Sequence, residues 1–413
     1  MRGVERHRAR ARRARSGHRP RVLLLIKCLG YGGAEQLMVD VAAHRDSQSF
    51  DYEVAYVLAA ENALVPFVAA TGVPVHALGA TSNADLRWTV ALRRLLLAGD
   101  YDVVHFHLPY AAALGRLVVL SLPRRRRPLL VYTEHNMWEK TEVVVRGLNR
   151  LGLGGVHRLI AVSQSVGDAL PASLRHRAAV VVHGMDLERA AELRADRDAV
   201  RRSVRRELGV PDGEVLVVTV ANLRPQKGYD VLLEAARLVA ADGAPVRFAA
   251  VGRGPQKEEL AARHEALGLG QRFQLLGQRS DALRLLAGAD VFVLASHYEG
   301  LPVAIMEATS VGLPIVSTAV GEVPNILTDG VDALIVPPGD PRALADAVER
   351  MAADPDLRTR LAAGALARSV MFDIARAVTR IESIYTELID SGLIDTGPID
   401  PGPIDPGLVD GAA

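Results

Sequence analysis

The sequence predicts an α/β protein made of two doubly wound, Rossmann-like domains that face each other across a cleft. Short apolar runs, typical of buried parallel strands, alternate with amphipathic helical stretches such as 84–97. The alternation comes in two series, separated by a polar, arginine-rich segment that also has helical character. The length of 413 residues suits two domains better than one.

Each series predicts six strands in chain order. In the first series the apolar runs occupy residues 22–27, 52–59, 73–79, 102–108, 129–135 and 158–163. In the second series they occupy residues 214–221, 246–252, 273–277, 290–296, 313–318 and 332–338. After the last strand, a helix near 373–388 places Val378, Ile381, Tyr385 and Leu388 on one face, which predicts that this face is buried.

Both ends of the chain are predicted to be disordered. Residues 1–20 are mostly arginine and alanine and offer almost nothing to bury. The tail 392–413 repeats proline every few residues, which prevents both helix and sheet. We expect neither segment to carry chemistry.

Composition limits the class of protein. Apolar residues make up 49% and charged residues 23%, and the net charge is +1, so we expect a globular protein without a nucleic-acid partner. The single cysteine, Cys28, fits a reducing compartment. The basic start is followed by an apolar run shorter than the roughly 7–15 residues of a signal peptide. No apolar run approaches the roughly 18–20 residues of a membrane span, so the predicted location is the cytoplasm.

Two glutamates in an apolar segment are the first candidate site residues. Glu299 follows the strand 290–296, and Glu307 lies in a helix expected to begin at Pro302. Ligands bind at the carboxyl ends of parallel strands, and free N–H groups at a helix N-terminus favour anions, so this segment predicts a phosphate site. The carboxylates would accept hydrogen bonds from sugar hydroxyls. A glutamate that simply reaches solvent is the alternative for Glu307.

A cationic turn follows the first strand of the second series. It contains Arg224 and Lys227, before the next helix. The chain has only four lysines against 45 arginines, so a lysine before a glycine at a strand end is unlike the background. Lysine offers a compact charge to a pyrophosphate and arginine a planar fork. A solvated turn is the alternative interpretation.

Four segments together resemble the retaining nucleotide-sugar glycosyltransferases of family 4, which have the GT-B fold. They are GYGGAE (30–35), LRPQKG (223–228), VGRGP (251–255) and EGLPVAIME (299–307), the last with the Glu-x7-Glu spacing. The resemblance covers about residues 21–390. It implies an acceptor-binding domain at 21–188 and a donor-binding domain at 189–372. It also implies that a last helix, at 373–391, crosses back to the first domain.

The resemblance implies a role for each matching residue. Glu299 matches the glutamate that contacts the transferred sugar, and Glu307 the one that holds the ribose hydroxyls. Lys227 matches the cation that neutralises the pyrophosphate, while Arg224 lies two residues after the position of the family's arginine. His135 matches the histidine over the sugar. The turns that meet the donor contribute Gly32, Gly33, Gly252, Gly300, Leu301 and Pro302. At His183 the family usually has asparagine.

The implied reaction moves a sugar from a nucleotide-sugar donor, a UDP- or GDP-sugar, to a hydroxyl of a lipid, glycan or small molecule, with retention of configuration. The catalytic group would be His135, Glu299, Arg224 and Lys227, with the two cations stabilising the leaving diphosphate. No metal or other cofactor is expected.

Other features favour competing interpretations. Asp100 and Asp102 have the Asp-x-Asp form of metal-dependent transferases but precede their strand, away from the ligand edge. His105 and His107 alternate on one strand and could bind zinc, yet no third ligand lies nearby in the sequence, which favours core or cleft lining. A basic run could contact the inner face of a membrane peripherally, through Arg124, Arg125, Arg126 and Arg127.

Two rival functions remain open from the sequence. One keeps the fold and changes the reaction, as in a nucleotide-sugar epimerase, a glucan synthase or a phosphorylase. The other is a non-catalytic partner protein that retains a nucleotide-binding shell. The Glu-x7-Glu spacing favours transfer over epimerisation, and the intact Glu299, Glu307, Lys227 and His135 weigh against a non-catalytic role.

Overall fold

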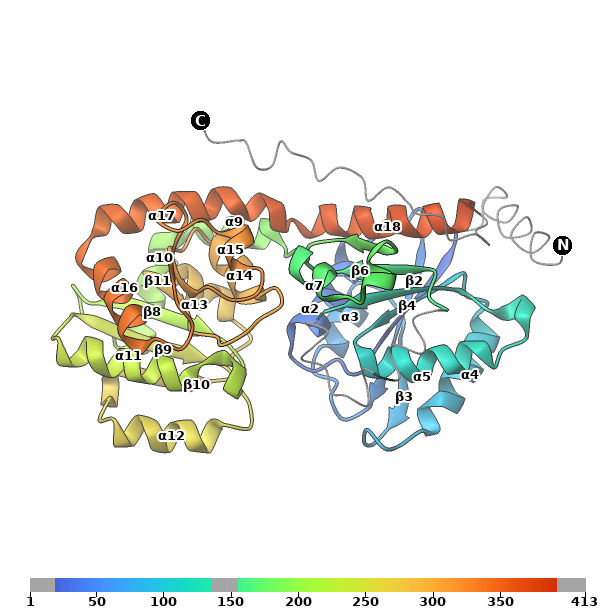
Figure 1. Ribbon diagram of the computed structural model, residues 1–413, viewed down its shortest axis with the longest axis horizontal. Helices are drawn as coiled ribbons and strands as arrows, with labels where there is room; N and C mark the ends of the chain where they lie inside the picture. Colours follow the sequence, from blue (N-terminus) through green and yellow to red (C-terminus); the bar gives the residue numbers. More distant parts are fainter. Residues whose placement is uncertain (1–18, 136–146, 148–154, 392–413) are drawn as a thin grey trace. The chain divides into compact units, whose positions relative to one another are not determined.

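The computed structural model describes residues 19–135, 147 and 155–391 (Figure 1). The segments predicted to be disordered, 1–20 and 392–413, therefore lie outside the described residues except for Arg19 and Pro20. The chain divides into two compact units, unit 1 (1–184 with 374–413) and unit 2 (185–373). The division falls between Gly184 and Met185, a few residues before the end of the expected first domain.

The described part of unit 1 contains a seven-stranded parallel sheet in the order β3-β2-β1-β4-β5-β6-β7. The strands are β1 (Arg21–Ile26), β2 (Asp51–Leu58), β3 (Val75–Ala80), β4 (Val103–His107), β5 (Leu129–Glu134), β6 (Arg158–Ala161) and β7 (Ala178–Val180). The helices are α2 (Gly33–His44), α3 (Val65–Ala70), α4 (Arg87–Gly99), α5 (Pro109–Leu120), α7 (Gln164–Ala169), α8 (Ala172–Arg175) and α18 (Ile374–Asp390), with the 3-10 turn η1 (Arg124–Arg126). β1, β4 and β5 are almost fully buried, as their continuous apolar runs predict.

The last helix, α18, completes the core of unit 1. Its predicted stripe of Val378, Ile381, Tyr385 and Leu388 is buried among apolar residues of α2 and the sheet. On the same helix, Glu382 accepts hydrogen bonds from the Tyr52 hydroxyl at 3.1 Å and from the Asp46 amide at 3.0 Å. The expectation that this stripe packs on residues before 185 is confirmed.

The described part of unit 2 contains a six-stranded parallel sheet in the order β10-β9-β8-β11-β12-β13. The strands are β8 (Val215–Val220), β9 (Val246–Val251), β10 (Phe273–Gly277), β11 (Val291–Leu294), β12 (Ile315–Thr318) and β13 (Ala333–Val336). The α-helices are α9 (Leu187–Ala195), α10 (Arg197–Leu208), α11 (Tyr229–Ala241), α12 (Lys257–Ala266), α13 (Ala282–Gly288), α14 (Val303–Ser310), α15 (Val323–Ile326), α16 (Pro341–Ala353) and α17 (Pro355–Arg368). Short 3-10 turns are η3 (Pro225–Lys227), η4 (Gly270–Arg272) and η5 (Ser369–Phe372).

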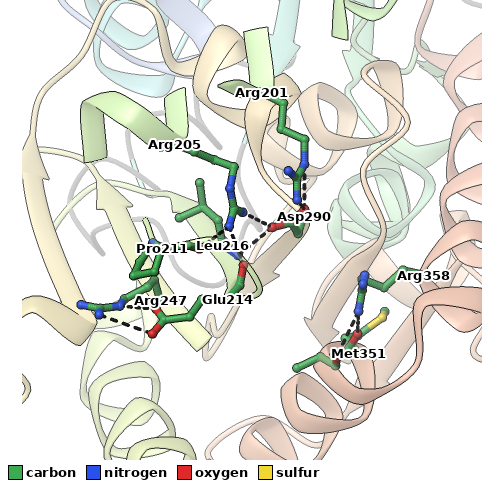
Figure 2. A network of polar contacts seen from close by, with 10 residues as sticks. Arg201, Arg205, Pro211, Glu214, Leu216, Arg247, Asp290, Met351 and Arg358 are labelled. Atoms are coloured by element: carbon green, nitrogen blue, oxygen red, sulfur yellow. Dashed lines mark hydrogen bonds and ion pairs between the residues drawn. The ribbon is translucent and has the colours of Figure 1, made fainter. Parts of the chain in front are cut away.

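The arginine-rich segment between the two series belongs to unit 2, where it forms α9 and α10. Figure 2 shows Arg201 and Arg205 of α10 converging on Asp290, which precedes β11, at 2.6 Å and 2.9 Å. The same carboxylate accepts the Leu216 amide of β8 at 2.8 Å. Asp290 therefore ties α10 to the amino edge of the sheet, and structural ion pairs occupy the edge opposite to the one that binds ligands in such folds.

Candidate functional site

The order of the strands in unit 2 predicts where a ligand binds. β8 and β11 are neighbours, and the chain continues from β8 toward one side of the sheet and from β11 toward the other. Ligands of doubly wound sheets bind outside the carboxyl ends of the strands at such a reversal. The turn after β8 carries Arg224 and Lys227, and the turn after β11 carries Glu299. The reversal therefore gathers the predicted donor-binding residues of unit 2.

The structure joins two of the predicted catalytic residues directly. Lys227 Nζ lies 2.5 Å from Glu299 Oε1, and both side chains are largely buried, with 17% and 7% of their surface exposed. The Ser296 hydroxyl, at the end of β11, donates to the same oxygen at 2.7 Å. Glu299 Oε1 is thus held by two donors, while Oε2 is the oxygen left to meet a ligand. Ser296 is a site residue that the sequence analysis did not identify.

Two glycines allow this close approach of the loops. A Cβ on Gly228, whose φ of +63° already favours glycine, would lie 2.0 Å from the carbonyl oxygen of Ala295. A Cβ on Gly252 would lie 1.9 Å from the carbonyl oxygen of Ala221. The loop that carries Lys227 therefore rests on the backbone just after β11, and the end of β9 rests on the backbone just after β8. A side chain at Gly228 or Gly252 would prevent these contacts.

The helix expected to begin at Pro302 begins one residue later. Pro302 is the N-cap of α14 in an extended conformation, and Val303 is the first helical residue, so the prediction for Pro302 is corrected by one position. Leu301 is buried, and the carbonyl of Gly300 accepts the amide of Glu322 at 3.0 Å, which fixes this turn. The N–H groups of the first turn of a helix have no partner within the helix, so α14 offers donors to an anion.

Glu307 is the fifth residue of α14 and is half-buried. It is therefore not a side chain that escapes fully to solvent, which was the alternative interpretation. Arg224 differs from Lys227, since it is exposed, whereas Lys227 is the cation in contact with Glu299. Arg224, which lies two residues after the position expected from the resemblance, is therefore more exposed than Lys227.

The carboxyl ends of β1, β4 and β5 hold the predicted residues of unit 1. Gly32 is the N-cap of α2, and Gly33 is its first residue and is exposed. A Cβ on Gly32 would meet only the carboxylate of Glu35, which is the end of a flexible side chain. Burial raises the pKa of the Glu35 carboxyl. The backbone of this turn is thus at least partly exposed, and the Glu35 carboxyl lies beside Gly32.

Four histidines, which we call the histidine array, gather at the same edge of the sheet. His105 and His107 lie on β4, and their ring centroids are 4.2 Å apart. His107 Nδ1 is hydrogen-bonded to His135 Nε2 at 3.1 Å, and His135 Nδ1 to His183 Nε2 at 3.0 Å. His105 and His107 are buried in the core, as the sequence analysis favoured over zinc binding, but His135 after β5 and His183 lie beside them, which no spacing in the sequence predicted.

The histidine array is held neutral by burial. Burial lowers the pKa of His105 to about 3 and that of His183 to about 4. It also lowers the pKa of His107 and His135 well below the ordinary value, with a smaller contribution from the neighbouring histidines. In this state the four imidazoles hydrogen-bond to one another or to hydroxyls. Among the described residues, no group of histidine, cysteine, aspartate and glutamate side chains has a geometry that could hold a metal ion.

Two other charged features have structural partners at the amino edge of unit 1. Asp102 precedes β4 and accepts the amide of Arg21 at 3.0 Å. In the basic run, Arg126 lies 3.8 Å from Asp100, and Arg127 donates to the carbonyls of Leu122, at 3.1 Å, and Leu120. Arg126 and Arg127 therefore cap the ends of α4 and α5, where the helix dipole favours cations, although Arg126 is exposed like Arg124 and Arg125. No helix of the described residues is long and apolar enough to cross a membrane.

Two family models match the chain. The model described as Glycosyltransferase Family 4 matches residues 10–189, and the model described as Glycosyl transferases group 1 matches residues 200–368. The first match covers most of unit 1, and the second covers the sheet of unit 2 with the Lys227–Glu299 pair.

Curated relatives have sugar-transfer activities in their names. The chain is 30% identical over 330 residues to an alpha-D-kanosaminyltransferase of Streptomyces kanamyceticus, covering 75% of this chain and 84% of the relative. It is 26% identical over 326 residues to an Escherichia coli UDP-Gal:alpha-D-GlcNAc-diphosphoundecaprenol alpha-1,3-galactosyltransferase, with 74% and 80% coverage. It is 31% identical over 318 residues to a D-inositol 3-phosphate glycosyltransferase of Xylanimonas cellulosilytica, with 70% and 72% coverage.

Solved structures share the fold. Anabaena HepE in complex with UDP-glucose has a TM-score of 0.75 and 23% identity, covering 89% of this chain and all of the other. A sucrose-phosphate synthase of Thermosynechococcus elongatus has a TM-score of 0.72 and 18% identity, with 90% and 100% coverage. The prediction of two Rossmann-like domains of the GT-B type is confirmed.

Proposed function

The chain belongs to glycosyltransferase family 4 and is a glycosyltransferase that uses a nucleotide-sugar donor, and from this premise we propose that it transfers the sugar of a UDP-sugar to a hydroxyl with retention of configuration. The observation that carries the proposal is the Lys227–Glu299 pair at the strand reversal of unit 2. A cation and a sugar-binding carboxylate meet there beside the N-terminus of α14.

The chemistry follows from these groups. Breaking the bond between sugar and diphosphate leaves developing negative charge, which Lys227, Arg224 and the first turn of α14 would stabilise. Glu299, with Oε1 occupied by Lys227 and Ser296, would orient a sugar hydroxyl through Oε2, and Glu307 would accept the ribose hydroxyls. His135 would lie over the sugar, and the backbone at Gly32, Gly33, Gly252, Gly300, Leu301 and Pro302 would approach the donor.

The choice of nucleotide rests on the neighbours of known structure. Anabaena HepE was solved with UDP, with UDP and glucose, and with UDP-glucose. We therefore place a UDP-sugar before a GDP-sugar as donor for this chain. The names of the relatives contain acceptors as different as a diphosphoundecaprenol-linked sugar and an inositol phosphate, so the acceptor is proposed only as a hydroxyl compound.

Thermal unfolding with UDP-, GDP- and ADP-sugars tests the donor proposal. A donor that binds only the folded state at 100 times its Kd raises the free energy of unfolding by about 2.7 kcal/mol. We expect the largest rise in Tm with a UDP-sugar. Nucleotide release that depends on an added hydroxyl acceptor would then show transfer, and the anomeric proton coupling of the product would show retention. No stabilisation by any of the three donors would overturn the proposal.

Glu307→Gln and Glu299→Gln are expected to affect different kinetic constants. Glu307→Gln keeps a hydrogen-bonding shape but loses charge-assisted acceptance, so it should weaken donor binding by roughly 1–3 kcal/mol with kcat largely kept. Glu299→Gln should mainly lower kcat, since its contact with the sugar matters more in the transition state. Donor titrations and initial rates separate the two effects, with the exposed Glu258→Gln as control. The same change in both constants for both variants would contradict the assigned roles.

Metal independence, a cytoplasmic location and peripheral membrane contact belong to the same proposal. The cationic groups near Glu299 would take the place of a metal at the diphosphate. The single cysteine supports a reducing compartment. Contact with an anionic membrane would rest mainly on Arg124 and Arg125, because Arg126 and Arg127 have helix ends to cap. Co-sedimentation with anionic vesicles tests this contact. If a variant with both Arg124→Gln and Arg125→Gln co-sediments as the wild type does, these two arginines do not bind the membrane.

A further inference from the structure

The histidine array gives His135 a hydrogen-bonding partner on each ring nitrogen. His107, on β4, is hydrogen-bonded to Nε2 of His135. His183, which follows β7, is hydrogen-bonded to Nδ1 of His135. The rings of His135 and His183 are also stacked, with centroids 4.9 Å apart and an interplanar angle of 26°. His105, His107 and His183 are buried, whereas His135 keeps part of its surface accessible. His135 is thus the array member best placed to touch a ligand, and its neighbours decide how its ring is oriented.

One end of this chain of imidazoles favours one polarity. His107 is 1% exposed, and its Nε2 is buried without a hydrogen-bond partner among the residues that the structure describes. Buried N–H groups without an acceptor are rarer in proteins than unsatisfied acceptors. This favours the His107 tautomer with its proton on Nδ1, which would donate to His135 Nε2. A neutral imidazole has one N–H, so His135 would then carry its proton on Nδ1 and donate to His183 Nε2.

α18 supports the buried end of the array. The Tyr385 hydroxyl lies 2.5 Å from His105 Nδ1, and the Thr133 hydroxyl lies 2.6 Å from His105 Nε2. Both nitrogens of His105 are hydrogen-bonded, so its ring has a fixed orientation, and this ring packs against the ring of His107. The His105 ring therefore restricts rotation of the His107 side chain.

We propose that His107 and His183 are positioning residues that hold His135 as a single tautomer, protonated on Nδ1, in the orientation needed for the sugar. His183 is the informative member, because it both hydrogen-bonds to His135 Nδ1 and stacks on the His135 ring. An asparagine oxygen can accept the same hydrogen bond, but it cannot stack on His135. In this chain the residue therefore combines a hydrogen bond with a ring contact.

The tautomer of His135 can be tested without assuming the proposed function, and only the effect on kcat rests on that function. The direct test of the tautomer is the 15N NMR spectrum of the histidine side chains in the full chain, which distinguishes protonated from unprotonated ring nitrogens. We expect the His135 signals to show a protonated Nδ1 and an unprotonated Nε2, without averaging. A protonated Nε2, or averaging of the two forms in the wild type, would overturn the proposal, whether or not the protein transfers a sugar.

Two substitutions of His183 separate hydrogen bonding from stacking. His183→Phe keeps a ring against His135 but removes the acceptor, and it should average the His135 tautomers. A lost orienting partner of a histidine typically costs about 10- to 100-fold in activity, so we expect that loss in kcat with little change in the KM for the donor. His183→Asn should restore a single tautomer and most of kcat.

Matched controls keep the outcome decisive. His76→Phe removes a histidine of the same unit that pairs with Glu53, outside the array, and should leave kcat unchanged. If His183→Phe fails to fold, the wild-type and His183→Asn spectra still decide the tautomer. If His183→Phe folds, averages the tautomers and keeps normal kcat, His183 is not a positioning residue. Equal losses of kcat in His183→Phe and His183→Asn, with one tautomer in both, would lead to the same conclusion.

Discussion

Replacement of Lys227 by alanine is expected to lower kcat/KM about 100- to 1000-fold, the usual cost of removing one preorganised group that stabilises developing negative charge. Lys227 Nζ lies 2.5 Å from Glu299, so its position is fixed before the donor arrives. Its charge cannot be supplied by Arg224 from the same place, since Arg224 is exposed. Initial rates of nucleotide release, at several donor concentrations, measure the loss.

The matched control is Lys257→Ala, which removes an exposed lysine at the start of α12 in the same unit. We expect it to retain the wild-type rate, and we expect the wild type to stay active in EDTA. Thermal unfolding shows whether Lys227→Ala, which leaves Glu299 with Ser296 alone, remains folded. A folded Lys227→Ala enzyme of normal rate, or activity lost in EDTA and recovered with manganese, would contradict the proposed mechanism.

The free energy of unfolding of unit 1 is expected to fall steeply as pH drops below about 6.5. An unfolded histidine has a pKa of about 6.5 and takes up a proton there. In the folded protein burial lowers the pKa of His183 to about 4 and of His105 to about 3, and those of His107 and His135 fall well below the ordinary value. At pH values between the pKa of a histidine in the folded state and its pKa in the unfolded state, the unfolded state binds more protons than the folded state. The free energy of unfolding therefore decreases with decreasing pH.

The size of the effect comes from the number of histidines. Each one lowers the free energy of unfolding by up to about 1.4 kcal/mol for each pH unit below 6.5. The carboxyls of Glu35 and Glu382 act in the opposite direction, because burial raises their pKa and the folded state then binds more protons. Two carboxyls oppose four histidines, so the net slope remains destabilising. Above pH 7 the contribution of the histidines is constant.

Urea unfolding at pH 7.5 and pH 5.5 measures this dependence. Trp88 is fully buried on α4 of unit 1, so its fluorescence reports on the unfolding of that unit. His183→Asn removes one of the four titrating groups and should reduce the pH dependence. Equal stability of the wild type at the two pH values would contradict burial of neutral histidines in the array.

Local patterns were sufficient to predict most of the fold. Strands that are buried on both faces have continuous apolar runs, and twelve such runs correspond to β1–β6 and β8–β13 with ends shifted by few residues. The stripe on α18 predicted its burial for the same reason. The one-residue shift at Pro302 reflects a limit of local signals, since proline is acceptable at the cap and in the first turn alike.

The donor side of the candidate site could also be predicted, because its residues lie in short segments that follow strands. Glu299 and Lys227 were identified from their own neighbours in the sequence, and the adjacency of β8 and β11 then brings them together. Ser296 was missed because a serine at the end of a strand has no pattern of its own. Its contact with Glu299 depends on the path of the turn between them.

The sequence by itself determined the two α/β units, the family, and the residues expected at the donor, because these depend on periodicity and on contiguous motifs. The tertiary structure decided how His105, His107, His135, His183 and Tyr385 meet. Those residues come from four separate segments, and no spacing in the sequence encodes their contacts. Burial in a common core favours neutral imidazoles, and a neutral imidazole can donate from only one of its two nitrogens, so the contacts among these residues limit the tautomers that each can adopt.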